Sequence, residues 1–233
     1  MFHPLLTGWR VADAAARSLR LCVVGDSIAT GTGDRQALGW HGRLAARAYA
    51  NGVDLTIYDL GVRGDTSLDV ARRWPGETAA RLPELFGSGI IFQFGLNDCT
   101  VRTFADGHSE RRVRFETSLA TTRSILLQAL ARHPTLFVGP APIDDSRPGP
   151  QLVPGVLQAT SNHDIRALGR QLEAVAHDVG VPCLAVFDAL DTDERWLRAM
   201  RDGDGIHPAD EGYDAMAELI ARWPAWQALV AAA

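Results

Sequence analysis

The feature that most constrains the fold of this chain is a regular alternation of short apolar runs with longer amphipathic segments. The apolar runs lie at residues 19–25, 53–60, 90–94, 135–138 and 182–187. The segments between them have the apolar spacing of helices and lie at residues 37–51, 67–82, 112–132 and 157–179. Strands that alternate with helices form a parallel sheet with helices on both faces.

This alternation predicts an α/β fold, a three-layer α/β/α sandwich around a five-stranded parallel sheet. Because crossover connections between parallel strands are right-handed, few topologies remain. We expect the flavodoxin-like strand order 2-1-3-4-5. Few linkers interrupt the 233 residues, so the sequence predicts one domain over residues 1–233.

The remaining segments are expected to be connections or short helices. Residues 1–18 are predicted to be an irregular or helical lead-in, and the polar residues 100–111 a loop. A proline-containing surface loop is expected at residues 141–156. A short helix near 192–201, a loop at 202–208 and a last helix from residue 209 complete the prediction.

Charge and cysteine content exclude several classes of protein. The net charge is -5 and every cationic residue is an arginine. The arginines are spread along the chain, and we interpret Arg72-Arg73 and the group Arg111, Arg112 and Arg114 as solvated helix faces. Nucleic acid is therefore not an expected partner. Cys22, Cys99 and Cys183 lack the spacing of a metal site, and Cys22 and Cys183 are expected in the core.

No apolar run approaches the ~20 residues that cross a bilayer. Charged residues interrupt the first 18 positions, which do not resemble a secretory signal. We therefore expect no membrane insertion and a cytoplasmic location.

Four polar clusters follow the predicted strands or precede the last helix. They are Gly25-Asp26-Ser27, Gly61–Gly64, Gly95–Asp98 and Asp204–Pro208. The carboxyl ends of parallel strands share one edge of a sheet, so the first three clusters are expected to face one crevice. The fourth cluster can fold over that crevice.

These clusters contain the groups that nucleophilic catalysis requires. Ser27 supplies a hydroxyl, and His207 supplies a base whose ordinary pKa of ~6.5 suits proton transfer near neutral pH. Asp204 lies three residues before the histidine and can orient its ring. Donors for a developing oxyanion are Gly64, Asn97 and the backbone N–H of Ser27.

The same clusters resemble the four sequence blocks of the GDSL, or SGNH, hydrolases. The blocks occur in the family's order over residues 25–208. The resemblance implies a flavodoxin-like sandwich and a catalytic triad of Ser27, Asp204 and His207. It implies an oxyanion hole from Ser27, Gly64 and Asn97. Two positions depart from the family pattern: Ile28 replaces leucine, and Asp59 replaces an asparagine whose turn-stabilising hydrogen bond is therefore in doubt.

The predicted function is that of a serine esterase or lipase that cleaves carboxylic or thioester bonds through an acyl-enzyme on Ser27. The mechanism needs no cofactor and no metal. The expected partner is a small-molecule ester, with carboxyl esters, thioesters, lysolipids and acetylated sugars left open. Residues 99–112 and 141–156 are expected to shape the pocket, and the oligomeric state stays open.

Two other function classes fit parts of the sequence. Thr30-Gly31-Thr32-Gly33 could hold a flavin phosphate through backbone N–H groups, as in an electron-transfer flavoprotein. That alternative leaves the Asp204–His207 pair unexplained. A non-catalytic binding module on the same fold is the other alternative.

Several candidate residues also have purely structural interpretations. Ser27 could cap a helix, and His207 could be a loop histidine before Pro208 at a helix start. Asn97-Asp98 could be a cap or an Asx turn, which is the preferred interpretation of Asp98. The acidic run Asp188, Asp191, Asp193 and Glu194 could bind a metal, but a solvated helix start is the preferred interpretation.

Overall fold

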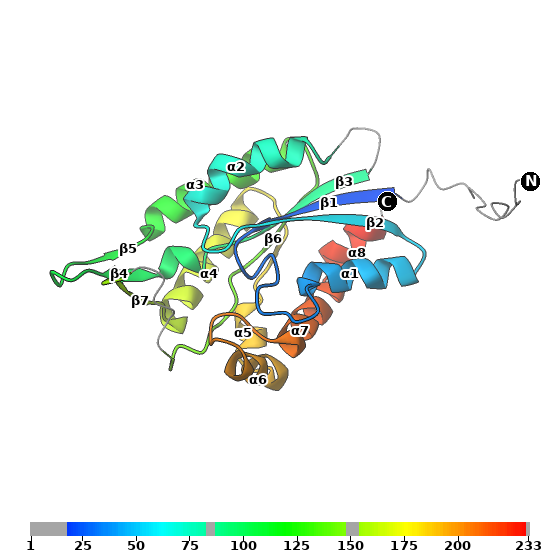
Figure 1. Cartoon of the computed structure of the whole chain (residues 1–233). Coiled ribbons are helices and arrows are strands. Elements are labelled where there is room, and N and C mark those ends of the chain that lie inside the picture. Colours follow the sequence, from blue (N-terminus) through cyan, green and yellow to red (C-terminus); the bar gives the residue numbers. More distant parts are fainter. Residues whose placement is uncertain (1–17, 83–86, 148–153, 232–233) are drawn as a thin grey trace, which may run out of the picture.

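A computed structural model describes residues 18–82, 87–147 and 154–231 (Figure 1). Its main sheet has five parallel strands in the order β2-β1-β3-β6-β8. The strands are β1 (Ser18–Gly25), β2 (Asp54–Gly61), β3 (Gly87–Gln93), β6 (Thr135–Val138) and β8 (Cys183–Leu184). This order is the predicted 2-1-3-4-5 arrangement, so the predicted topology is confirmed.

Helices cover both faces of this sheet, as Figure 1 shows. One face carries α1 (Gly39–Ala50), α7 (Asp210–Ala221) and α8 (Pro224–Ala231). The other face carries α2 (Ser67–Ala79), α3 (Phe115–Leu130) and α4 (Asn162–Asp178). The short helices α5 (Phe187–Leu190) and α6 (Glu194–Asp202) lie between β8 and α7 in the chain. The result is the predicted three-layer α/β/α sandwich.

The alternation of side chains along β1 divides the core in two. Leu21 and Val23 face α1 and α7, while Cys22 and Val24 face α2, α3 and α4. All four side chains are fully buried. Because β1 is the middle of the three longest strands and is covered on both sides, its carboxyl end has a rigid position.

A second, small antiparallel sheet was not predicted. It consists of β4 (Val101–Thr103), β5 (Ser109–Arg111) and β7 (Leu157–Ala159), in the order β5-β4-β7. The prediction of a plain loop at 100–111 is therefore wrong, because its two ends pair as a hairpin. Residues 157–159 pair with β4 instead of starting a helix, and α4 begins only at Asn162, after Ser161 caps it.

Four other predictions need correction or lie outside the described residues. The last strand is shorter than 182–187, because α5 begins at Phe187. Helix α8 follows the predicted last helix as a separate element. Cys183 is half-buried, whereas Cys22 is in the core as expected. The expected lead-in at residues 1–18 falls almost wholly outside the described residues. None of the described helices is long and apolar enough to cross a membrane.

Candidate active site

The carboxyl end of β1 places Ser27 in a tight turn. A Cβ atom on Gly25 would lie 1.9 Å from the carbonyl oxygen of Gln93 on β3, so only glycine fits this close approach. The Asp26 Oδ1 atom accepts a hydrogen bond from the N–H of Ile28 at 2.9 Å, and the Ser27 carbonyl accepts from Thr32 at 2.9 Å. These bonds fix Ser27, which is 6% exposed, at the sheet edge.

The loop between α6 and α7 brings a histidine and an aspartate to this serine. Asp204 Oδ1 accepts hydrogen bonds from the N–H groups of His207 (2.7 Å) and Ile206 (2.9 Å). Asp204 Oδ2 lies 2.7 Å from His207 Nδ1, and His207 Nε2 lies 2.8 Å from Ser27 Oγ. The carboxylate holds the proton on Nδ1, which leaves Nε2 to accept the hydroxyl proton of Ser27.

The charge on Asp204 is stabilised by this arrangement. Partial burial raises its pKa, but the hydrogen bonds from the His207 ring and from the two backbone N–H groups outweigh that effect. The pKa of Asp204 is therefore below its ordinary value, and the carboxylate is ionised at neutral pH.

The two other candidate donors lie at the ends of β2 and β3. Gly64 has a φ of +82°, a conformation that favours glycine. Asn97 belongs to a short 3-10 helix (Asn97–Cys99), and its Nδ2 donates to the carbonyl of Asp65 at 2.9 Å. The same Nδ2 lies 3.4 Å from Asp26 Oδ2, at the long end of hydrogen bonding. Both residues line the same cavity as Ser27.

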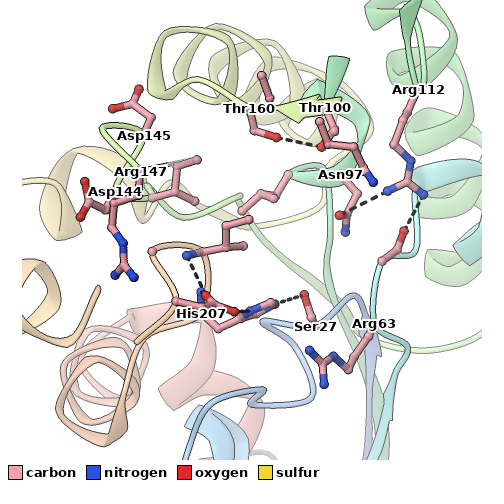
Figure 2. A pocket seen from close by; sticks show the side chains of 18 of the residues that line it. Ser27, Arg63, Asn97, Thr100, Arg112, Asp144, Asp145, Arg147, Thr160 and His207 are labelled. Atoms are coloured by element: carbon pink, nitrogen blue, oxygen red, sulfur yellow. Dashed lines mark hydrogen bonds and ion pairs between the residues drawn. The ribbon is translucent and has the colours of Figure 1, made fainter. Parts of the chain in front are cut away.

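Arg112 connects these two residues. Its Nη2 donates to the Gly64 carbonyl at 2.7 Å, and its Nη1 lies 3.4 Å from Asn97 Oδ1 (Figure 2). The interpretation of Arg112 as part of a solvated helix face is therefore wrong. It is wrong also for Arg111, which donates to the Cys99 carbonyl, and for Arg73, which donates to the Gly25 and Leu60 carbonyls.

Asp98, next to Asn97, is structural. It is fully buried, accepts a hydrogen bond from the N–H of Ser67 at the start of α2, and accepts another from Ser118 of α3. Burial raises its pKa, and the bonds from Ser118 and Ser67 oppose that effect. Asp98 thus caps α2 and fixes the segment that carries Asn97.

The doubt about Asp59 is removed by the structure. Its Oδ1 accepts a hydrogen bond from the N–H of Gly61 at 2.9 Å, and its Oδ2 accepts one from the hydroxyl of Thr30. An aspartate therefore stabilises the turn after β2 as an asparagine carbonyl would.

A cavity of about 650 Å³ opens beside Ser27 and His207. Part of its wall comes from residues 143–147 and from Thr100 and Arg112, which agrees with the expectation that residues 141–156 and 99–112 shape the pocket. Strand β7 adds to the wall and was not expected there. Residues 148–153 of that first loop lie outside the described residues. The lining residues are Ser27, Arg63, Gly64, Leu96, Asn97, Thr100, Arg112, Ile143, Asp144, Asp145, Ser146, Arg147, Leu157, Gln158, Ala159, Thr160, Asp204, Gly205, Ile206 and His207.

The loop proposed for a flavin phosphate has a different role. The N–H groups of Thr30, Gly31 and Thr32 donate to carbonyls of the preceding turn. They are therefore not available to bind a phosphate. Gly33 packs against the His207–Pro208 segment, where a Cβ atom would lie 3.0 Å from the Pro208 carbonyl oxygen. The loop supports the histidine.

The acidic run after β8 is explained by local contacts. Asp193 caps α6 by accepting from the N–H groups of Arg195 and Trp196. Asp188 and Asp191 pair with Arg166. Within residues 18–82, 87–147 and 154–231, no group of three or more His, Cys, Asp or Glu side chains is arranged to hold a metal ion.

Comparison with known proteins points to one family. A sequence model of the GDSL-like Lipase/Acylhydrolase family matches residues 23–215. That segment contains all four polar clusters. Among curated proteins, none matches the chain significantly.

Several solved structures share the fold at low sequence identity. A lipase/acylhydrolase from Enterococcus faecalis is 20% identical, with 87% of this chain and 93% of that chain covered and a TM-score of 0.63. TesA is 24% identical, with 90% and 99% covered and a TM-score of 0.64. An acetylxylan esterase from Geobacillus stearothermophilus is 18% identical, with 89% and 95% covered and a TM-score of 0.62.

Proposed function

Since the chain belongs to the GDSL-like lipase/acylhydrolase family and is an ester-hydrolysing serine hydrolase, we propose that Ser27 is its nucleophile, His207 its general base and Asp204 the carboxylate that orients the base. The observation that carries this proposal is the chain of two short hydrogen bonds, Ser27 Oγ to His207 Nε2 and His207 Nδ1 to Asp204 Oδ2. Residues 180 positions apart meet there, at the mouth of a cavity.

The proposed reaction has two halves. Ser27 Oγ attacks the ester carbonyl carbon while its proton passes to His207 Nε2, and the leaving alcohol takes that proton as the C–O bond breaks. Water then attacks the acyl-enzyme, gives a proton to the same nitrogen, and Ser27 regains its proton as the acid is released. The ionised Asp204 carboxylate stabilises the imidazolium in both halves.

The oxyanion formed in each half needs donors, and we assign these to the N–H groups of Ser27 and Gly64 and to the Asn97 amide. Three observations support the assignment. The residues share one cavity wall, Gly64 has no side chain to obstruct approach, and Arg112 holds both the Gly64 carbonyl and the Asn97 carbonyl oxygen. Donors fixed in advance stabilise the developing charge without reorganisation.

The proposed substrate is a small carboxylic ester. The cavity is large enough for a small acyl or sugar group and includes the apolar side chains of Leu96, Ile143, Leu157 and Ile206. Proteins of similar structure include a lipase/acylhydrolase and an acetylxylan esterase. Two variants of that second enzyme, changed at an aspartate and at a histidine, are described as catalytic mutants, which supports the roles proposed for Asp204 and His207.

A panel of p-nitrophenyl esters of increasing acyl length, with acyl-CoA and acetylated sugars beside it, tests this function. We expect turnover of at least one ester and a loss on the order of 10⁴-fold or more in kcat for Ser27→Ala. Ser146→Ala is the matched control, because Ser146 lines the same cavity and, among the described residues, its hydroxyl bonds only Asp144. Hydrolysis that survives in Ser27→Ala would contradict the proposed nucleophile, and a complete absence of turnover would favour a non-catalytic binding module.

A further inference from the structure

We propose that the cavity selects esters that carry an anionic group, a carboxylate or a phosphate, and that Arg63, Arg102 and Arg112 provide the selectivity. The inference rests on the proposed esterase function and adds a substrate class to it. Its basis is a group of three arginines, here called the cationic wall. Arg63 and Arg112 line the cavity, and Arg102 lies close enough to Arg112 to influence it. Among the described residues, none of the three has a carboxylate within ion-pair distance.

Arg63 is the most accessible member of the cationic wall. It precedes Gly64, is exposed and lines the cavity. It makes no hydrogen bond or ion pair with any residue of the described ranges. In Figure 2, Arg63 is drawn on the same side of the cavity as Asn97 and Arg112, and all three line the cavity with Ser27. A charged, unpartnered donor in that position is free to bind substrate.

Arg112, which also lines the cavity, and Arg102, which lies near Arg112, add two further positive charges. The hydrogen-bond partners of Arg112 are a backbone carbonyl and an amide oxygen, neither of which neutralises it. Arg102, on β4, has a buried Nε atom without a hydrogen-bond partner. Glu110 lies opposite Arg102 in the β4–β5 register but is not within ion-pair distance. Burial and the nearby positive charge of Arg102 lower the pKa of Arg112, and the carboxylates of Asp69, Asp98 and Asp65 oppose that effect.

Carboxylates near the cationic wall are already engaged with other groups. Asp65 pairs with Arg73, Asp69 with Arg72, and Asp98 accepts from Ser67 and Ser118. By contrast, the largely buried Arg43 and Arg73 each pair directly with a carboxylate. None of these carboxylates forms an ion pair with the cationic wall, and the guanidinium of Arg63 has no partner among the described residues, which favours an anion.

Apart from Asp204 of the proposed triad, the described acidic residues that line the cavity are Asp144 and Asp145, which lie away from the cationic wall. Figure 2 shows Asp144 and Asp145 together with Arg147 on the opposite side from Arg63 and Arg112. Asp144 accepts a hydrogen bond from the Ser146 hydroxyl, and Asp145 accepts one from the N–H of Asn162. Both carboxylates are thus hydrogen-bonded, and they lie across the cavity from Arg63 and Arg112. Their negative charge repels the anionic group of a substrate and so orients that group toward the cationic wall.

The test compares matched neutral and anionic acetyl esters. We would measure kcat/KM for 4-acetoxybenzoate, for its neutral methyl ester and for 4-acetoxyphenyl phosphate in the parent enzyme and in the variants Arg63→Gln and Arg102→Gln. For each enzyme we take the ratio of kcat/KM for the anionic ester to kcat/KM for the neutral ester. Dividing the ratio of each variant by that of the parent cancels the difference in chemical reactivity between the esters. We expect Arg63→Gln to lower this ratio roughly ten-fold, the effect of losing a charge-assisted contact. Arg102→Gln should lower it by a smaller factor, because Arg102 does not line the cavity and acts only through its charge.

The matched control is Arg132→Gln, which makes the same change in charge at an exposed position that does not line the cavity. The anionic-to-neutral ratio of kcat/KM in Arg132→Gln should equal the parent's. Comparison of 4-acetoxybenzoate with 4-acetoxyphenyl phosphate identifies which anion is preferred. The preference should also shrink as salt rises from about 0.05 to 0.5 M, because screening weakens exposed charge pairs.

A parent enzyme that hydrolyses the neutral ester, with ratios unchanged in Arg63→Gln and Arg102→Gln, would overturn the inference and leave the proposed function intact. If no ester is turned over, the proposed function fails, and binding still tests the inference. In that case Ser27→Ala should bind 4-acetoxybenzoate roughly ten-fold more tightly than Ser27→Ala with Arg63→Gln. Equal affinities would overturn the inference.

Discussion

Replacement of Asn97 by alanine separates two roles that the structure gives to one side chain. The Nδ2 group has two hydrogens, and one of them donates to the Asp65 carbonyl at 2.9 Å. The other faces Asp26 Oδ2 at 3.4 Å, a weak contact that leaves it free for an oxyanion in the cavity. Asn97→Ala therefore removes a structural bond and a proposed catalytic donor together.

The two losses differ in size. A neutral hydrogen bond such as that to Asp65 contributes about 1 kcal/mol to stability. In a chain of this length such a loss lowers Tm by roughly 2–4 °C. Loss of an oxyanion donor costs roughly 2.7–4 kcal/mol in the transition state, or about a hundred- to thousand-fold in kcat. The expected result is a small fall in Tm and a large fall in kcat, with little change in KM.

Both quantities are measured on one preparation, by thermal unfolding and by ester hydrolysis well below Tm. Ser118→Ala is the matched control, because it removes the hydrogen bond to the neighbouring Asp98 without touching the cavity. The control should lose stability and keep its kcat. If Asn97→Ala loses stability but keeps a kcat close to that of the parent, Asn97 is a structural residue and the proposed oxyanion hole is wrong.

Three further predictions follow from the same geometry. Asp204→Asn should lower kcat about 10⁴-fold, because the amide no longer holds the Nδ1 proton of His207. A kcat within ten-fold of the parent's would argue against the proposed role of Asp204. The control variant is Asp202→Asn, which should keep the parent's kcat. Burial raises the pKa of Asp26 to about 7, so the folded chain keeps a proton that the unfolded chain releases, and the free energy of unfolding should fall as pH rises from about 4 to about 7. The size of that fall is a few kcal/mol, at roughly 1.4 kcal/mol per pKa unit, and Asp26→Asn should remove it. Denaturant titrations at pH 5 and pH 8 measure the free energy of unfolding, and an equal change between the two pH values in the parent and the variant would refute the prediction. Leu157 lines the cavity and is 59% exposed. Leu157→Ser should lower kcat/KM for hexanoyl esters several-fold relative to acetyl esters, because each buried CH₂ of the acyl chain contributes ~0.8 kcal/mol. The control Leu127→Ser on α3 should leave this dependence on acyl length unchanged. An unchanged dependence in Leu157→Ser would show that the acyl chain lies elsewhere.

The predictable part of the fold came from periodicity. Apolar runs such as 90–94 and 135–138 are long enough to identify buried strands, and glycine and polar residues mark their ends. Because parallel strands end at one edge, the sequence also predicted that Ser27, Gly64 and Asn97 would meet there. The structure brings all three to one cavity.

The unpredicted parts depend on contacts between distant residues. Strands β4 and β7 have three residues each, too few to show a pattern, and they form because Val101 pairs with Ala159 across the chain. Arg112 resembled a surface residue because its partners, Gly64 and Asn97, are distant in sequence. The burial that raises the pKa of Asp26 is likewise a property of the packed chain.

Covalent labelling of the nucleophile tests the central claim most directly. A serine-directed organophosphonate should add once per chain, and mass spectrometry of the digest should place the adduct on Ser27, with labelling abolished in Ser27→Ala and His207→Ala. Ser146 is the informative competitor, because it lines the same cavity. An adduct on Ser146 or on any serine other than Ser27 would contradict the proposed mechanism.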